Sequence, residues 1–152
     1  MGEVVSLAER RWWSSGFDAV FKLGIELVNE TANYLDGPGR SESAALSRPS
    51  QVSYATVSMR MTALLMQLAS WLLVVRSFKE SETTKEQLIA ELKMKEILAE
   101  TLKAIDLEHT NVLPEMLCML VKRTDKLREI IVLADAEFVQ KLTSETPQSA
   151  SG

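Results

Sequence analysis

SMRMTALLMQLASWLLVVR, residues 58–76, is the stretch that decides the fold class of this chain. It is apolar almost all the way round a helix and carries Arg60 and Arg76 near its ends. The span between the arginines is shorter than the about 20 apolar residues that a bilayer-spanning helix needs, and three polar residues interrupt it. A helix that is apolar on every face must be covered by neighbouring helices, in its own chain or in a second chain. The stretch therefore predicts an all-α bundle and a homodimer, with no membrane span.

Length and composition fit one bundle domain in a reducing compartment. The chain has 152 residues, of which 46% are apolar, enough for a real core. Its 17 basic and 21 acidic residues give a formal net charge of -4, which disfavours sequence-independent binding to nucleic acid or anionic lipid. Cys118 is the single cysteine and lies among apolar neighbours, so we expect it to be buried and reduced, in the cytoplasm. Protein partners are expected, and nucleic acid is not.

The first helix is expected to begin near residue 15 with Ser14 or Ser15 as its cap. Gly37 is expected to end it in the left-handed conformation, and residues 40–50, rich in serine and alanine, to form a flexible connection. Gly24 lowers helix propensity within the apolar seam, which predicts a close approach by a neighbouring helix. Alternating steps of four and three residues define that seam as Phe17, Phe21, Gly24, Val28, Thr31 and Leu35.

Three further helical segments follow, which makes a three- to four-helix antiparallel bundle. The second helix is expected over about 51–79. Thr83 or Thr84 can cap a third segment, whose many charged residues indicate an outer helix, although the sequence leaves open whether 85–107 is a regular helix or a looser connector. The fourth has Pro114 in its first turn. It carries the most regular seam: Leu113, Leu117, Leu120, Thr124, Leu127, Ile131, Ala134 and Phe138.

The bundle domain is expected to span residues 15–142. Residues 1–14 have no sustained period and predict a flexible N-terminal arm, whereas residues 143–152 are polar, have nothing to bury and predict a disordered tail. The second and fourth helices both have apolar surface to spare, so the sequence does not fix which of them forms a dimer seam. The candidates for core or dimer seam are Leu65, Leu68, Trp71, Leu72, Leu127 and Ile131.

The chain offers few groups that could converge on a reaction. It has one histidine and one cysteine, with no Gly-rich phosphate loop and no pair of residues at metal-ligand spacing. Cys118 lacks any sign of a thiolate-stabilising environment. His109 is more typical of a solvated turn than of a phosphotransfer domain, because the residues after it do not fit the pattern of such domains. No enzyme activity, cofactor or metal ion is predicted.

Two groups of basic residues are considered as possible binding sites. The densest patch contains acidic neighbours at helical spacing, which is typical of a solvated face with ion pairs and not of a helix that reads DNA. This patch consists of Lys122, Arg123, Lys126 and Arg128. Arg60 and Arg76, at the ends of the apolar helix, either anchor carboxylates of a partner or extend to water.

Two blocks of the sequence resemble the hallmark blocks of the regulator of CtrA degradation (RcdA) family. The first begins at Phe17-Asp18 and continues through VNETANYLDGPGR at residues 28–40. The second consists of SMRMT at residues 58–62 and LMQLASWLL at residues 65–73. Both blocks occur in order and with suitable separation, and the resemblance covers roughly residues 15–80. The charged segment 85–107 departs from the looser connector expected of the family.

The resemblance implies a helical-bundle homodimer from an alphaproteobacterium, which acts as a non-enzymatic adaptor for the ClpXP protease in cell-cycle control. Such an adaptor docks on a protease already primed by a response-regulator adaptor. It then tethers cell-cycle substrates of the CtrA type, or a further adaptor that responds to cyclic di-GMP. The location implied is the cytoplasm, with recruitment to a cell pole as one expectation.

The candidate partner-binding residues are Arg40, Arg60 and Arg76, and in the tail Thr143, Glu145 and Pro147. Tethering needs no catalytic group, because it acts by raising the effective concentration of a substrate at the protease. Two alternatives stay open at this point. One is a dimeric helical scaffold without a protease partner, and the other is a small DNA-associated regulator, whose binding would weaken steeply with salt.

Overall fold

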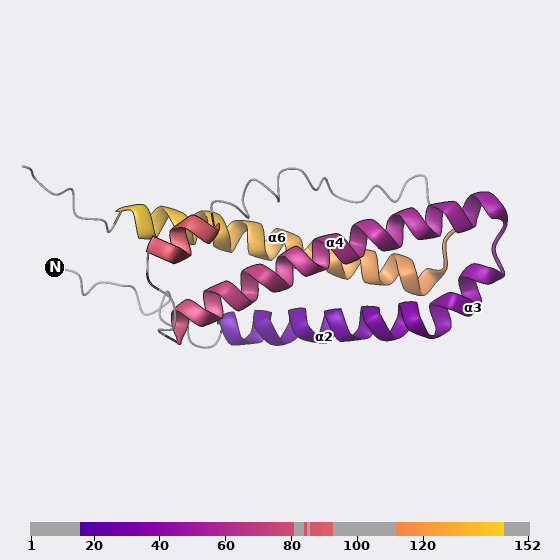
Figure 1. The fold of residues 1–152 in the computed structure, drawn as a ribbon, viewed down its shortest axis with the longest axis horizontal. Helices are drawn as coiled ribbons and strands as arrows, with labels where there is room; N and C mark the ends of the chain where they lie inside the picture. The colour runs from indigo at the N-terminus through magenta and orange to yellow at the C-terminus, as the bar shows by residue number, and fades with distance from the viewer. Residues whose placement is uncertain (1–15, 81–83, 85, 93–111, 145–152) are drawn as a thin grey trace, which may run out of the picture.

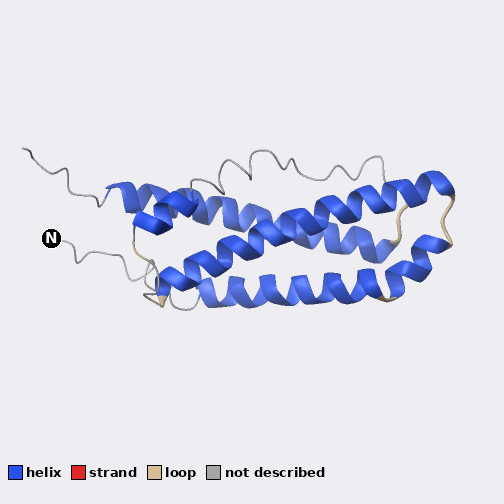
Figure 2. Ribbon diagram, in the orientation of Figure 1, coloured by secondary structure: helices blue, strands red, loops and turns tan. Residues whose placement is uncertain are grey.

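The computed structural model describes residues 16–80, 84, 86–92 and 112–144. Helices make up almost all of these residues, and the described part of the chain contains no strand (Figure 2). The predicted all-α class is confirmed. The helices are α2 (Phe17–Asp36), α3 (Pro38–Ala44), α4 (Arg48–Lys79) and α6 (Glu115–Ser144), and residues 86–92 are also helical.

The long helices α2, α4 and α6 lie along the length of the molecule, and each contacts the other two (Figure 1). The short helix α3 turns the chain between α2 and α4, so that α4 runs back along α2. α4 crosses α6 diagonally, and both run in the same direction, antiparallel to α2 (Figure 1). Three helices therefore form the described bundle, with residues 86–92 packed onto it through Leu88 and Leu92.

One hydrophobic core fills the space between these helices, and α4 supplies the largest share of it. Its buried residues are Ser50, Tyr54, Val57, Met61, Leu64, Leu65, Leu68, Trp71, Leu72 and Val75. Leu127 and Ile131 of α6 are buried against them. All six residues proposed as core or dimer seam therefore lie in the core of one chain.

α4 is long and apolar enough to cross a membrane, by length and composition alone. In the structure one side of it packs against α2 and α6. Neighbouring helices of the same chain do not cover every side of α4, because large apolar side chains on its opposite side are exposed. Coverage of that side by a second chain stays a prediction. The reason is geometric: two neighbouring helices cover only part of the circumference of a third.

The connection between α2 and α4 also differs from the prediction. Gly37 has φ −117° and ψ −107°, which is not the left-handed conformation. Pro38 then begins α3, so residues 38–44 are helical and do not form a flexible link. α4 likewise begins at Arg48 with Pro49 in its first turn. Both prolines start helices because the fixed φ of proline suits the first helical turn, where the missing N–H is not needed.

The seam of α2 is shifted from the predicted one. Phe17, Gly24 and Thr31 are buried as expected, but Leu27 and Tyr34 replace Val28 and Leu35, which are half-buried. The close approach predicted at Gly24 is confirmed, because a Cβ atom there would lie 2.5 Å from Cδ1 of Leu72. α2 therefore packs directly against α4 at the level of Gly24.

Caps were predicted for two other helix starts, and the structure shows one of them. Thr84 caps residues 86–92 reciprocally: its Oγ1 accepts the Gln87 N–H at 3.3 Å, and its own N–H donates to Gln87 Oε1 at 3.3 Å. At the start of α2, by contrast, Gly16 occupies the cap position and no side chain bonds there. The predicted caps Ser14 and Ser15 lie outside the described residues, as does most of the predicted third helix.

The fourth predicted helix corresponds to α6. Pro114 lies just before it, and its carbonyl accepts the Cys118 N–H at 3.2 Å. Cys118 is half-buried, less covered than expected. α6 continues to Ser144, so Thr143 lies in its last turn and not in a tail. Residues 145–152 lie outside the described part of the chain.

Candidate protein-interaction surface

Within the described residues, no group of three or more His, Cys, Asp or Glu side chains comes together. The described residues do carry an exposed apolar face on α4 and several charged contacts between helices.

The side of α4 opposite the core carries an uncharged stripe. Its large members are Val52, Met59, Met66 and Leu73, which recur every seven residues and are 68%, 73%, 61% and 53% exposed. Seven residues are close to two helical turns, so these side chains share one face of α4. The residues between them are small: Ala55, Thr56, Thr62, Ala63, Ala69 and Ser70. We call this set the α4 stripe.

The three arginines proposed as partner anchors lie at different levels along the bundle. Arg40 is exposed on α3, at the opposite end of the molecule from the C-terminal end of α4, where Arg76 lies (Figure 1). Arg60 is exposed near the middle of α4. The structure therefore does not bring them into a single basic site.

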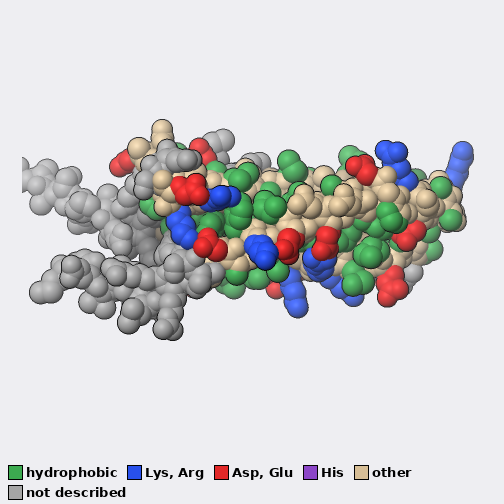
Figure 3. All heavy atoms as spheres, turned by 90° about the horizontal axis from the view of Figure 1, so that it is seen from below, with side chains coloured by type: hydrophobic (Ala, Val, Ile, Leu, Met, Phe, Trp, Pro, Cys, Tyr) green, Lys and Arg blue, Asp and Glu red, His purple; other side chains and the backbone are tan. Residues whose placement is uncertain are grey.

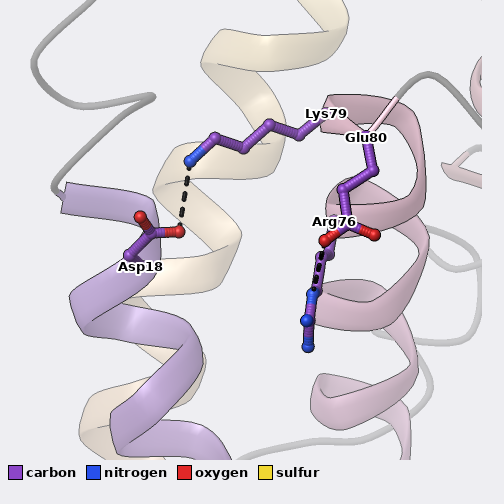
Figure 4. Close-up of polar contacts among 4 residues, drawn as sticks. All are labelled: Asp18, Arg76, Lys79 and Glu80. Carbon is purple, nitrogen blue, oxygen red and sulfur yellow. Dashed lines mark hydrogen bonds and ion pairs between the residues drawn. The ribbon is translucent and has the colours of Figure 1, made fainter.

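Arg76 is engaged within its own chain. Its Nε donates to Glu80 Oε1 at 3.1 Å (Figure 4), and its guanidinium lies 4.7 Å from the centre of the Phe21 ring. Next to it, Lys79 Nζ donates to Asp18 Oδ1 at 3.1 Å, which joins the end of α4 to the start of α2 (Figure 4). These exposed pairs each contribute at most about 1 kcal/mol to stability. Their effect is to neutralise the charge at this end of the bundle.

The basic patch on α6 is a solvated face with ion pairs, as predicted. Arg128 Nε donates to Asp125 Oδ1 at 2.8 Å, and Arg123 donates to Glu30 on α2. On the face where α2 lies, basic and acidic side chains alternate between hydrophobic ones (Figure 3). The charge is thus mixed over this face and forms no continuous basic surface of the kind that binds nucleic acid.

The pKa of the Glu30 carboxyl lies below its ordinary value, chiefly because Arg123 donates a hydrogen bond to the charged form. A lowered folded-state pKa stabilises the fold above the ordinary carboxyl pKa, and this contribution is lost as the pH falls through the lowered value. We expect Glu30→Gln to lower the melting temperature slightly at neutral pH and not at all in strong acid. Melting curves of both proteins across this pH range test it, with Glu26→Gln, an exposed change on the same helix, as the control. A difference that persists in acid would contradict the ion-pair explanation.

The DGPGR segment that ends the first family block forms a tight junction between α2, α3 and α4. Tyr34 donates its hydroxyl hydrogen to Glu42 Oε2 at 2.5 Å, and burial together with this carboxylate raises the pKa of Tyr34. A Cβ atom on Gly39 would overlap the Tyr54 hydroxyl and lie 2.7 Å from the Tyr34 carbonyl oxygen. Only glycine fits between the two tyrosines, which gives a packing reason for this position of the motif.

Sequence reasoning missed one core contact and the sidedness of α4. Trp71 Nε1 donates to Asp135 Oδ1 at 2.8 Å, a bond between α4 and α6 that only the register of the two helices reveals. The available signal in the sequence was Asp135 itself, an acidic residue next to Ala134 in the apolar seam of α6. The seven-residue recurrence of the large residues in the α4 stripe was the sequence signal for its exposed side. It is hard to recognise because most residues around it are apolar as well.

Fold and surface together define an all-α bundle protein whose candidate functional features, in the described part, are surfaces for other proteins. Residues 8–151 match the family model described as "Protein of unknown function (DUF1465)". The chain belongs to this family, which is the RcdA family. No protein among curated proteins matches it in sequence. Among solved structures, the chain is similar to RcdA from Caulobacter crescentus CB15, with 39% sequence identity and a TM-score of 0.67. The match covers 89% of this chain and 98% of that chain.

Proposed function

We propose that this protein is a non-enzymatic adaptor that delivers cell-cycle regulators of the CtrA type to the ClpXP protease by tethering. One observation carries the proposal: the similarity to RcdA, a regulator of CtrA degradation, over nearly the full length of both chains. The fold is compatible with this role, because a rigid bundle with an exposed apolar face can hold a partner without performing chemistry on it.

The partners that follow from this proposal are all proteins. They are ClpXP with its priming response-regulator adaptor, the cell-cycle substrates, an adaptor that responds to cyclic di-GMP, and a second copy of this chain. Holding a substrate beside the protease on a short flexible tether gives it an effective concentration in about the millimolar range. The proposed setting is the cytoplasm, with recruitment to a cell pole.

Arg40 and Arg60 are the proposed anchors for partner carboxylates, since both side chains are exposed on the bundle. Arg76 is a weaker anchor, because a partner would have to compete with Glu80 and Phe21 for its guanidinium. Glu145 and Pro147, proposed as tail contacts, lie outside the described residues, and Thr143 belongs to the end of α6.

Reconstituted proteolysis tests the function. We expect ClpXP with the priming response regulator to degrade a CtrA-type substrate faster when this protein is added, and the rate to fall again at excess adaptor, as tethering requires. Arg60→Ala should weaken the stimulation, whereas Lys122→Ala, an exposed change on α6, should not. Deletion of residues 145–152 should weaken delivery and leave the melting temperature unchanged. No stimulation with any substrate would favour a dimeric scaffold without a protease partner.

A further inference from the structure

We propose that Met59 and Met66 form a redox-sensitive modification site, at which a peroxide reversibly converts the apolar face of α4 into a polar one. The core of the bundle is left unchanged by this reaction. Its effect on substrate delivery rests on the adaptor role proposed above, whereas the chemistry and the exposure of the two thioether groups do not.

Met59 and Met66 present their side chains to solvent one seven-residue step apart on the α4 stripe. They are 73% and 61% exposed, whereas Met61, only two residues after Met59, is fully buried in the core. An oxidant must reach the sulfur atom, so exposure decides which methionine reacts. The same helix therefore carries two reactive methionines and one that the fold protects.

The other members of the α4 stripe do not respond to a mild oxidant. Val52 and Leu73 have hydrocarbon side chains, and the small members are alanine, serine and threonine. None of these side chains ionises near neutral pH, so a change of pH leaves the polarity of the stripe unaltered. The two thioether groups are thus the part of the stripe whose polarity oxidation can change.

The reaction is a two-electron oxidation of sulfur by hydrogen peroxide. The thioether sulfur attacks one peroxide oxygen, the O–O bond breaks and an S–O bond forms. The proton of the new S–OH group passes to the departing hydroxide, which gives the sulfoxide and water. The flexible apolar side chain thereby becomes polar and chiral. A methionine sulfoxide reductase reverses the step, with two thiols as the reductant, and yields the thioether, a disulfide and water.

A second pair of exposed methionines, on α6, supplies the matched control. Met116 and Met119 are 48% and 51% exposed. Their neighbours include the exposed charged residues Glu115 and Lys122, so this face of α6 is already polar. Oxidation there adds a polar group to a charged face, whereas oxidation on the α4 stripe removes apolar character from an uncharged one. The two pairs thus separate the chemistry of methionine from the effect of its location.

Peptide mass spectrometry of the full chain treated with hydrogen peroxide tests the site, with Cys118→Ser to remove the thiol as a competing target. We expect Met59 and Met66 to be oxidised at least about tenfold faster than Met61, which reacts only when the fold opens. Binding of a dye specific for apolar surface should fall, and the melting temperature should stay unchanged. Oxidation of Met59 and Met66 as slow as that of Met61, or a lowered melting temperature, would overturn the proposal.

Reconstituted proteolysis with the oxidised protein, after removal of peroxide, tests the effect on delivery. We expect the concentration for half-maximal stimulation to rise about tenfold, because a sulfoxide buried against a partner loses its hydrogen bonds to water. A reductase should restore it.

The double variant Met59→Leu/Met66→Leu keeps the side-chain volume and should stimulate with or without peroxide treatment. The control Met116→Leu/Met119→Leu should stay sensitive. Unaltered stimulation by the oxidised wild type, or sensitivity that persists in Met59→Leu/Met66→Leu, would overturn the regulatory role. If the untreated protein does not stimulate at all, the adaptor function fails, and the oxidation pattern and dye binding still decide the site.

Discussion

Trp71→Ala is expected to lower the free energy of unfolding by about 3 to 5 kcal/mol. The indole is only 4% exposed in the core, and its N–H bonds to Asp135 on α6. The substitution removes a large side chain from a close-packed site and leaves a cavity that the neighbouring helices can fill only in part. Urea unfolding followed by circular dichroism measures the change.

Three controls separate volume from hydrogen bonding at this site. Trp71→Phe keeps most of the apolar contact but loses the N–H, so we expect a loss between that of alanine and zero. Asp135→Asn keeps an acceptor oxygen for the indole and should cost less than Trp71→Phe. Leu73→Ala changes an exposed neighbour and should stay within about 0.5 kcal/mol of the wild type. A loss below about 1 kcal/mol for Trp71→Ala would contradict the packing of α4 against α6 described above.

Gly39→Ala is expected to destabilise the protein by about 1 to 3 kcal/mol, the usual cost of overpacking a closely packed site. The added methyl group would overlap the Tyr54 hydroxyl and press on the Tyr34 carbonyl oxygen. The tyrosine side chain can rotate, but the carbonyl belongs to the backbone of α2 and moves only with the helix. α3 must therefore shift away from α2 and α4, which thermal melting of the variant would detect.

Gly37→Ala is the matched control for this junction. It lies in the same motif, and a Cβ atom there would meet only the Asn33 carbonyl oxygen at 3.0 Å. We expect it to cost less than Gly39→Ala. Adding Tyr54→Phe to Gly39→Ala should recover part of the loss, because it removes one of the two overlapping groups. Equal effects of the two glycine substitutions, or no recovery, would show that the contact with Tyr54 is not the cause.

The parts of the fold that the sequence predicted well are those in which the spacing of apolar residues within one helix determines which residues are buried. The strict alternation of four and three residues in the fourth helix fixed its buried face, from Leu117 to Phe138. The apolar stretch around Trp71 identified the central helix, since no other segment could supply so much core. In both cases the pattern within one segment was sufficient, and the two motif blocks then indicated the family.

The features that the sequence did not predict depend on how separate helices pack against one another. Whether a proline after a glycine ends one helix or starts the next depends on where the chain can turn, so α3 could not be separated from a loop. The bond from Trp71 to Asp135 requires the register between α4 and α6, which no single segment encodes. Which side of α4 is exposed depends on the positions of both neighbouring helices, although the seven-residue recurrence along α4 was a signal for it.

The contact between α2 and α6 also determines the order in which the bundle can be completed during synthesis. Glu30 and Arg123 are 93 residues apart in the chain, whereas α2, α3 and α4 follow one another directly. α2, α3 and α4 are neighbours in the chain and can pack together early, whereas the core side of α4, including Trp71, is completed only by the distant α6. Late, non-local closure of this kind prolongs the exposure of apolar surface. Without α6, the apolar side of α4 that packs against it would be exposed.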